Sequence, residues 1–226
     1  SLLTSEGISK IEVELPEGIS ADSEEGAALL SALELALATS DVRNAFHSLI
    51  MPSWLSPYFA LSEPITAAEL GVTGEIVDGV ALLKSDLVFL CSRPWPMGCT
   101  WSLYFCQHAL EYQSRQVSLL KNSILMQDCK RTTIIKLGPN DFWRLFHYVY
   151  VDNLGCLGVG RKRVEAALME FGDSLENKGL KIHEFQCTTQ TGETLGTYLD
   201  MSKLLSSITH DRYWKLYLGL TFVRNR

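Results

Sequence analysis

The chain has 226 residues, of which 46% are apolar and 20% are charged. This balance is typical of a globular protein with a hydrophobic core. No apolar run reaches the roughly 20 residues that span a bilayer, so we expect no membrane partner. The net charge of −6 is uneven: residues 1–90 hold three basic and 14 acidic side chains, and the remainder holds 17 and 12. A polyanionic partner is therefore expected to prefer the C-terminal part.

The chain begins with Ser1, and no basic segment precedes an apolar stretch and a cleavage site, so we predict no signal peptide. Its six cysteines include no Cys-x-x-Cys pair and no His/Cys cluster at zinc spacing. We expect free thiols, most of them buried, which indicates a reducing intracellular compartment, cytoplasm or nucleus. The cysteines are Cys91, Cys99, Cys106, Cys129, Cys156 and Cys187.

The first ninety residues alternate between polar segments and short apolar ones. Residues 1–26 are expected to be irregular apart from a strand at 11–15, and the Ala/Leu-rich residues 27–38 suit either a helix or a buried strand. A turn into a short helix follows at 41–49. We expect a strand at 58–61 and a short helix at 67–70. A second strand is expected at 80–90, where apolar residues alternate and β-branched residues occur.

The second half shows clearer periodicity. Two prolines and a glycine predict a loop at 93–98, and a helix is expected at 101–120, followed by a polar excursion over 121–139. Residues 142–159 predict a hairpin that turns near Asp152 and Asn153. Val164, Leu168, Phe171 and Leu175 line one stripe of a helix at 161–178, which Gly179 ends. We expect strands at 180–184 and 195–199 and a basic, aromatic helix at 212–223.

This order of elements predicts an α+β fold. It suits a split βαβ arrangement, with helices on one face of an antiparallel sheet. Two carboxylates, Asp41 at the end of one segment and Asp152 at a hairpin tip, can then meet at the same sheet. Such a pair can hold two Mg²⁺ or Mn²⁺ ions roughly 4 Å apart for a phosphoryl transfer.

Several motifs in the chain resemble those of the reverse transcriptases, in the same order. They are Asp41-x-x-x-Ala45-Phe46, Pro96-Met-Gly98 with Gln107, Tyr150-x-Asp152, Gly179-Leu-Lys-Ile-His183 and Leu195-Gly196. The residues in these motifs resemble those of retrotransposon-type enzymes. The resemblance implies a polymerase palm with a ferredoxin-like sheet at 36–200. It implies partial fingers in an irregular segment at 1–35, and the start of a thumb at 201–226.

The resemblance also implies a role for each matching residue. Asp41 and Asp152 would be the catalytic metal ligands for two Mg²⁺ or Mn²⁺ ions, and Lys181 the proton donor to the pyrophosphate. The implied substrate-binding residues are Phe46, Gly98, Gln107 and Tyr150, with the ring of Phe46 favouring deoxynucleotides. Arg212, Lys215 and Arg224 would follow the backbone of an RNA or DNA template–primer. The implied partners are that duplex and deoxynucleoside triphosphates.

Other interpretations remain open for the same residues. Asp41 also suits a helix cap, and Asp152-Asn153 suits ordinary turn chemistry. The family usually has a second aspartate where Asn153 stands, and residues 1–40 contain Lys10 as their only base. The chain is therefore an active polymerase from a mobile element, a decayed or domesticated copy that keeps the fold and binds nucleic acid, or an unrelated α+β binding protein. The glycines at 155, 158 and 160 lack the Lys-Ser/Thr of a phosphate-binding loop.

Overall fold

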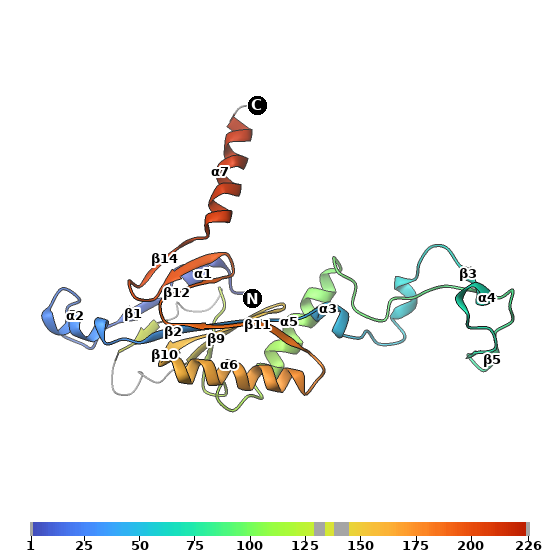
Figure 1. Ribbon diagram of the computed structural model, residues 1–226, viewed down its shortest axis with the longest axis horizontal. Helices are drawn as coiled ribbons and strands as arrows, with labels where there is room; N and C mark the ends of the chain where they lie inside the picture. Colours follow the sequence, from blue (N-terminus) through green and yellow to red (C-terminus); the bar gives the residue numbers. More distant parts are fainter. Residues whose placement is uncertain (1, 129–133, 138–144, 225–226) are drawn as a thin grey trace. The chain divides into compact units, whose positions relative to one another are not determined.

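The computed structural model describes residues 2–128, 134–137 and 145–224 (Figure 1). The protein is a mixed α+β structure with several sheets, and the chain divides into two compact units. Ser1–Arg43 and Phe105–Arg226 form one unit, which we call the sheet unit. Asn44–Tyr104 form the other, which we call the inserted unit.

The sheet unit is built on a five-stranded sheet with the order β11-β2-β10-β9-β7. Its neighbours pair antiparallel, except that β7 runs parallel to β9. If the four longer strands are numbered in chain order, their order across the sheet is fourth, first, third, second. The strands are β2 (Leu35–Val42), β7 (Ile124–Leu125), β9 (Leu145–Tyr150), β10 (Asn153–Val159) and β11 (Ile182–Thr188).

Two helices cover one face of this sheet. Helix α6 (Arg161–Glu176) packs on β2, β10 and β11, and Gln107 of α5 (Thr100–Ser114) donates a hydrogen bond to the backbone of β9. A hydrogen bond from Gln113 on α5 to Ser174 on α6 joins the two helices. The four apolar residues predicted to line α6 are at most 1% exposed, which confirms that stripe. Small Ala36 and Ala38 on β2 are fully buried, and small side chains let a helix approach closely.

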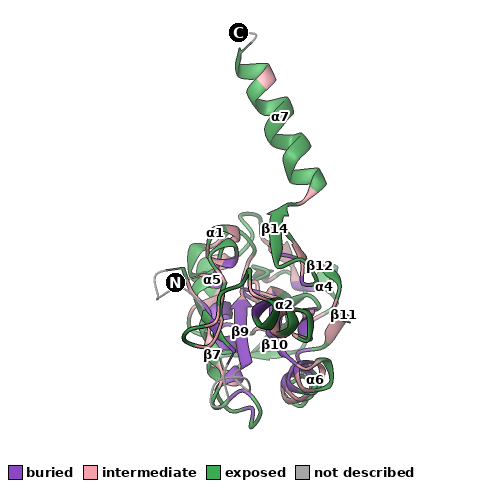
Figure 2. Cartoon of the chain, turned by 90° about the vertical axis from the view of Figure 1, so that its left-hand side faces the viewer, coloured by how far each residue is buried: buried purple, intermediate pink, exposed green. Residues whose placement is uncertain are grey.

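The opposite face packs against smaller elements. Alternate residues of the strands point there, including Leu37, Phe146 and Leu157, and they form a core with Ile8, Ile135 and Met201. Figure 2 shows most of β9 as buried. The covering elements are α1 (Ser5–Ser9), the parallel pair β1 (Glu12–Glu14) and β8 (Ile134–Lys136), and the sheet of β12 (Thr191–Thr194), β13 (Thr197–Asp200) and β14 (Leu205–Ile208).

The ring of Tyr148 requires a glycine across the sheet. Tyr148 pairs with Gly155, where an added Cβ would lie 2.1 Å from the ring. The hydroxyl of Tyr148 contacts Thr194 on β12, and burial raises the pKa of this phenol. The ring therefore ties the small sheet to the large one, and this packing depends on the missing side chain at Gly155.

The remaining helices of the sheet unit are α2 (Glu24–Ser31) and α7 (His210–Arg224). Helix α7 is exposed along almost its whole length (Figure 2). None of the helices in the described residues is both long enough and apolar enough to cross a bilayer. The inserted unit contains α3 (Ala45–Ser48), a 3₁₀ helix at Ser56–Phe59, α4 (Ala67–Leu70) and two strand pairs, β3 (Ile65–Thr66) with β6 (Leu87–Val88) and β4 (Ile76–Val77) with β5 (Val80–Ala81).

Several predicted elements are confirmed and others are wrong. The hairpin at Asp152, the helix at 67–70 and the short strand near 11–15 are confirmed. The N-terminus is less irregular than expected, because Thr4 and Ser23 cap two helices. The ambiguous segment 27–38 is neither one helix nor one strand, since α2 ends at Ser31 and β2 begins at Leu35.

Three predicted elements differ in type or length. The strand at 58–61 is wrong, because Pro57 in the first turn favours the 3₁₀ helix. The strand at 80–90 is two short strands, and the helix expected to reach Leu120 ends at Ser114. Part of the excursion at 121–139 and the start of the hairpin, 142–144, lie outside the described residues. Five cysteines are free thiols, and Cys129 lies outside the described residues. The expectation that most thiols are buried is wrong for these five, because Cys106 and Cys156 are buried and the others are partly or fully exposed.

Candidate functional site

Asp41 lies on β2, between two strands that come from distant parts of the chain. Its register partner on β10 is Asn153, and its partner on β11 is His183. The Nδ1 atom of His183 faces the Oδ1 atom of Asp41 as an ion-pair contact. Neither atom has a hydrogen-bond partner among the described residues, although both atoms are buried. The Asp41 carboxylate is therefore in direct contact with an imidazole nitrogen.

Asp152 lies in the turn between β9 and β10. Its carbonyl oxygen accepts a hydrogen bond of 2.8 Å from the Val42 N–H, the residue after Asp41. Its carboxylate accepts one of 2.8 Å from the Asn153 side chain. The structure therefore brings together the ends of two segments that carry the predicted carboxylates, 111 positions apart in the sequence.

The residue before Asp152 has an unusual backbone conformation. Val151 has a φ of 57°, in the left-handed region, which a β-branched side chain disfavours. Such a conformation costs on the order of 1–3 kcal/mol and persists only where its surroundings hold it. At this turn the surroundings are side chains of α5.

Gln107 on α5 holds the turn through the backbone on both sides of Tyr150. Its Oε1 accepts from the Val151 N–H at 2.7 Å, and its Nε2 donates to the Val149 carbonyl at 2.8 Å. The Cys106 thiol donates to the Val151 carbonyl at 3.4 Å. Burial, with a smaller contribution from the charge of Asp152, raises the pKa of Cys106 to about 12, so this thiol stays protonated. Gln107 is only 8% exposed, and its amide is occupied by the turn.

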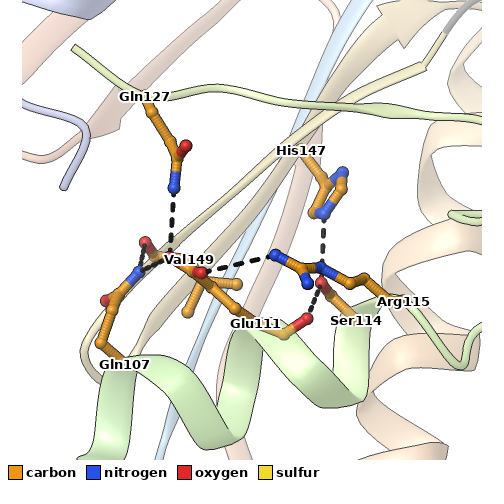
Figure 3. Close-up of polar contacts among 7 residues, drawn as sticks. All are labelled: Gln107, Glu111, Ser114, Arg115, Gln127, His147 and Val149. Carbon is orange, nitrogen blue, oxygen red and sulfur yellow. Dashed lines mark hydrogen bonds and ion pairs between the residues drawn. The ribbon is translucent and has the colours of Figure 1, made fainter. Parts of the chain in front are cut away.

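A buried polar network continues from Gln107 along α5 (Figure 3). The carboxylate of Glu111 accepts from Gln107 and Gln127, and Ser114 and Ser123 bond the two ring nitrogens of His147 on β9. Burial, assisted by the charge of Arg115, lowers the pKa of His147 to about 4. His147 is therefore a neutral, structural imidazole at pH 7, and the network fixes α5 against the strand that leads to Asp152.

Two cavities flank Asn153 on the sheet unit. One, of about 490 Å³, is lined by Asp41, Tyr148 and Glu184 among others, and the other, of about 590 Å³, by Tyr150, Arg212 and Lys215. Asn153, Leu195 and Gly196 line both. Both lie on the face opposite α6; the first is mainly polar and the second is about half apolar, and the first leaves Asp41 accessible to a ligand from that side.

The other residues predicted for the site lie in different surroundings. Lys181 is exposed just before β11, and its carbonyl accepts from the Arg43 N–H at 2.8 Å. The Arg212 guanidinium donates to the Ser5 hydroxyl and to the Leu195 carbonyl. Lys215 and Arg224 are exposed on α7. The structure therefore brings Tyr150, Arg212 and Lys215 to one cavity, while Arg224 lies at the far end of the helix.

Phe46 and Gly98 belong to the inserted unit. Phe46 is half-buried on α3, and Gly98 has a φ of 89° in the loop before α5. That conformation explains a glycine at position 98, because other residues rarely adopt it. Their contacts with a nucleotide remain predictions.

Two neighbours of Asp41 had no assigned role from the sequence alone. His183 and Glu184 come together with Asp41 because of the strand register. A short Ile-His-Glu segment does not by itself indicate which residue its side chains contact. A signal was present, since His183 ends the Gly-Leu-Lys-Ile-His segment and belongs to a predicted strand. Its significance required knowing that this strand pairs with β2.

The donor atoms at the end of β2 include oxygens that suit a hard divalent cation. Carboxylate oxygens are ligands that Mg²⁺ and Mn²⁺ prefer, and Asp41 Oδ1 is a buried oxygen without a hydrogen-bond donor among the described residues. Asp152 offers a second carboxylate on the neighbouring turn, and Asn153 can offer a neutral oxygen. These residues fit the implied ions.

Comparisons with known proteins show limited overlap. No family model and no curated protein matches the chain. An apo telomerase from Candida tropicalis, truncated from its C-terminal domain, overlaps with a TM-score of 0.42 at 9% identity, covering 77% of this chain and 35% of its own. A telomerase from Candida albicans, in complex with a TWJ fragment of telomeric RNA, overlaps with a TM-score of 0.44 at 14% identity, covering 78% and 31%. This chain thus spans about a third of the length of those chains.

Proposed function

We propose that this chain is the palm of a reverse-transcriptase-like, template-directed DNA polymerase of the retrotransposon type. The observation that carries the proposal is the pairing between the end of β2 and the start of β10. Asp41 is in register with Asn153, and the next residue, Val42, bonds to the backbone of Asp152. Two carboxylates from separate segments are thereby anchored on adjacent backbone, as a two-metal phosphoryl transfer requires.

The strand order supports the same proposal. A fourth-first-third-second order, with both connecting helices on one face, is that of a ferredoxin-like split βαβ sheet. In a polymerase palm of this kind the helices support one face and the substrates bind the other. Here the cavities beside Asp41 and Tyr150 open on the face that α6 leaves free.

In the proposed reaction, bound Mg²⁺ or Mn²⁺ would stabilise the negative charge that develops when a primer hydroxyl attacks a deoxynucleoside triphosphate. Asp41 and Asp152 would hold the ions, and Gln107 would keep Asp152 in place through the turn. Lys181 would donate a proton to the pyrophosphate. Phe46 and Gly98 would line the nucleotide, and Arg212, Lys215 and Arg224 would attract the template–primer backbone.

Primer extension on an RNA template with deoxynucleotides tests this proposal. We expect Mg²⁺- or Mn²⁺-dependent extension, reduced by roughly a hundredfold or more in Asp41→Asn and in Asp152→Asn, because each removes a charged ligand. Asp173→Asn, at an exposed position on α6, is the matched control and should retain activity. Extension that persists in Asp152→Asn would exclude the proposed metal pair.

One observation favours a second candidate, a non-catalytic copy of the fold that binds nucleic acid. His183 contacts Asp41, and the neutral Asn153 stands beside Asp152, so both carboxylates already have neighbours within the chain. This candidate predicts salt-dependent binding of a template–primer, measured by fluorescence anisotropy, without extension in either metal. Arg212→Ala with Lys215→Ala should then weaken binding, whereas Asp152→Asn should not.

A further inference from the structure

A second type of metal site can be built at Asp41, on the side of β11. One ligand atom each of Asp41, His183 and Glu184 lies within 4.8 Å of the other two. The Asp41 side chain is partly buried, whereas the side chains of His183 and Glu184 are exposed, so the group is open to solvent on one side. Among the described residues, this is the one group of His, Cys, Asp and Glu side chains with that spacing.

The register of β11 explains why the three side chains converge. His183 pairs with Asp41, whereas Gln186 pairs with Thr39, so β11 has one residue more than β2 between these pairs. This bulge contains Glu184, which has a φ of 55°. Successive side chains of a regular strand point to opposite faces, and a bulge redirects one of them. Glu184 thereby joins His183 and Asp41.

Two atoms of the group are buried and contact each other. Asp41 Oδ1 and His183 Nδ1 face each other in an ion-pair contact, and neither has a further hydrogen-bond partner among the described residues. Both atoms have lost their contacts with water, and carboxylate oxygens and imidazole nitrogens are both metal ligands. A cation that binds both atoms would replace those contacts.

The donor set indicates which cation. One imidazole nitrogen with two carboxylate oxygens is a mixed nitrogen and oxygen site, and imidazole suits zinc and neighbouring first-row metals better than Mg²⁺. We infer that Asp41, His183 and Glu184 bind one first-row transition-metal ion, with water completing its coordination. The site uses Asp41 but not Asp152, and it does not depend on polymerase activity.

Zinc titration of the metal-free chain by isothermal calorimetry tests the inference without any substrate. We expect one Zn²⁺ per chain, bound at least tenfold more tightly than Mg²⁺. His183→Gln and Glu184→Gln should each weaken Zn²⁺ by roughly tenfold or more, the effect that loss of even a supporting group has at metal sites. His47→Gln and Glu176→Gln, at exposed positions, are the matched controls and should bind like the unaltered chain.

Two further measurements keep the outcome unambiguous. Circular dichroism melts verify that each variant is folded, and Zn²⁺ should raise the Tm of the unaltered chain but not of His183→Gln. Asp152→Asn should bind Zn²⁺ within about twofold of normal, even if it abolishes extension. If Asp152→Asn loses Zn²⁺ while His183→Gln keeps it, or if Zn²⁺ and Mg²⁺ bind equally, the inferred site is overturned.

Discussion

The sheet unit and the inserted unit use similar residue types with very different results. The sheet unit buries aromatic and branched side chains such as Phe146, Tyr148 and Phe171 at no more than 2% exposure. Among residues 44–104, all of which the structure describes, the buried hydrophobic side chains are Ala45, Met51, Ala67 and Trp95, while Trp54 is 71% and Tyr58 is 80% exposed. Composition alone therefore does not separate core from surface in this protein.

The physical difference lies in the partners that each segment finds. Strands β2, β10 and β9 each pair along six or more residues and have elements on both faces. The strands of the inserted unit are two residues long, and its regular structure depends on turns and caps. Burial stabilises a strand in proportion to the apolar area removed from water, so most of the folding free energy comes from the sheet unit.

The largest expected effect comes from the core of the sheet unit. Phe171→Ala should lower the free energy of unfolding by about 3–5 kcal/mol, because it leaves a cavity between α6 and the sheet. Phe89→Ala, the same change at a side chain that is 55% exposed in the inserted unit, should cost less than about 1 kcal/mol. Urea unfolding of both variants makes the measurement, and equal losses would contradict the contrast between the units.

A smaller effect is expected at the turn that carries Asp152. Gln107→Leu keeps a side chain of similar size but leaves the Val151 N–H and the Val149 carbonyl without their partner. Leaving these two buried groups unpaired should lower the free energy of unfolding by about 2–3 kcal/mol, as measured by urea unfolding. Gln116→Leu, at an exposed position just after α5, is the control. A loss no larger than that of the control would mean that the turn does not need Gln107.

The buried imidazole gives the sheet unit a pH dependence. Because burial lowers the pKa of His147 to about 4 from its usual value of about 6.5, the unfolded chain takes up a proton between these values and the folded protein does not. Its contribution is complete above pH 6.5 and falls with decreasing pH, by about 2 kcal/mol between pH 7 and pH 5. His147→Asn should remove this part of the slope.

The matched variant for that measurement is His47→Asn in the inserted unit. His47 is exposed, so the substitution should leave the pH dependence of unfolding as it is in the unaltered chain. Chemical unfolding at pH 7 and pH 5 measures all three proteins. An unchanged slope in His147→Asn would show that another group titrates in this range.

The smallest effect concerns a helix cap in the inserted unit. The Thr66 hydroxyl accepts from the Glu69 N–H at 3.2 Å, and the Glu69 carboxylate accepts from the Thr66 N–H at 2.9 Å. Thr66→Ala should destabilise α4 locally by about 1 kcal/mol, seen as faster amide exchange at residues 67–71, with global unfolding almost unchanged. Thr73→Ala, at an exposed site, is the control. A large global loss would show that the two units unfold together.

The local pattern was sufficient where the chain has strong periodicity. The apolar stripe of α6, the hairpin that turns at Asp152 and the short helix at 67–70 follow from residue spacing and caps. It was insufficient at 27–38, where an apolar run divides into α2 and β2, and at 58–61, where Pro57 favours a 3₁₀ helix over the predicted strand. At 27–38 the outcome depends on which segments pair, and periodicity contains no information about distant partners.

The same division applies to the candidate site. The sequence by itself determined that Asp41 and Asp152 are the carboxylates to examine, because each ends a recognisable local segment. Only the tertiary structure decided that β2 lies between β10 and β11, and hence that Asn153 and His183 are the neighbours of Asp41. It also decided that Gln107 supports the turn and that a bulge turns Glu184 toward Asp41. Strand register and bulges are set by packing across the whole sheet, and a one-residue shift would exchange every neighbour.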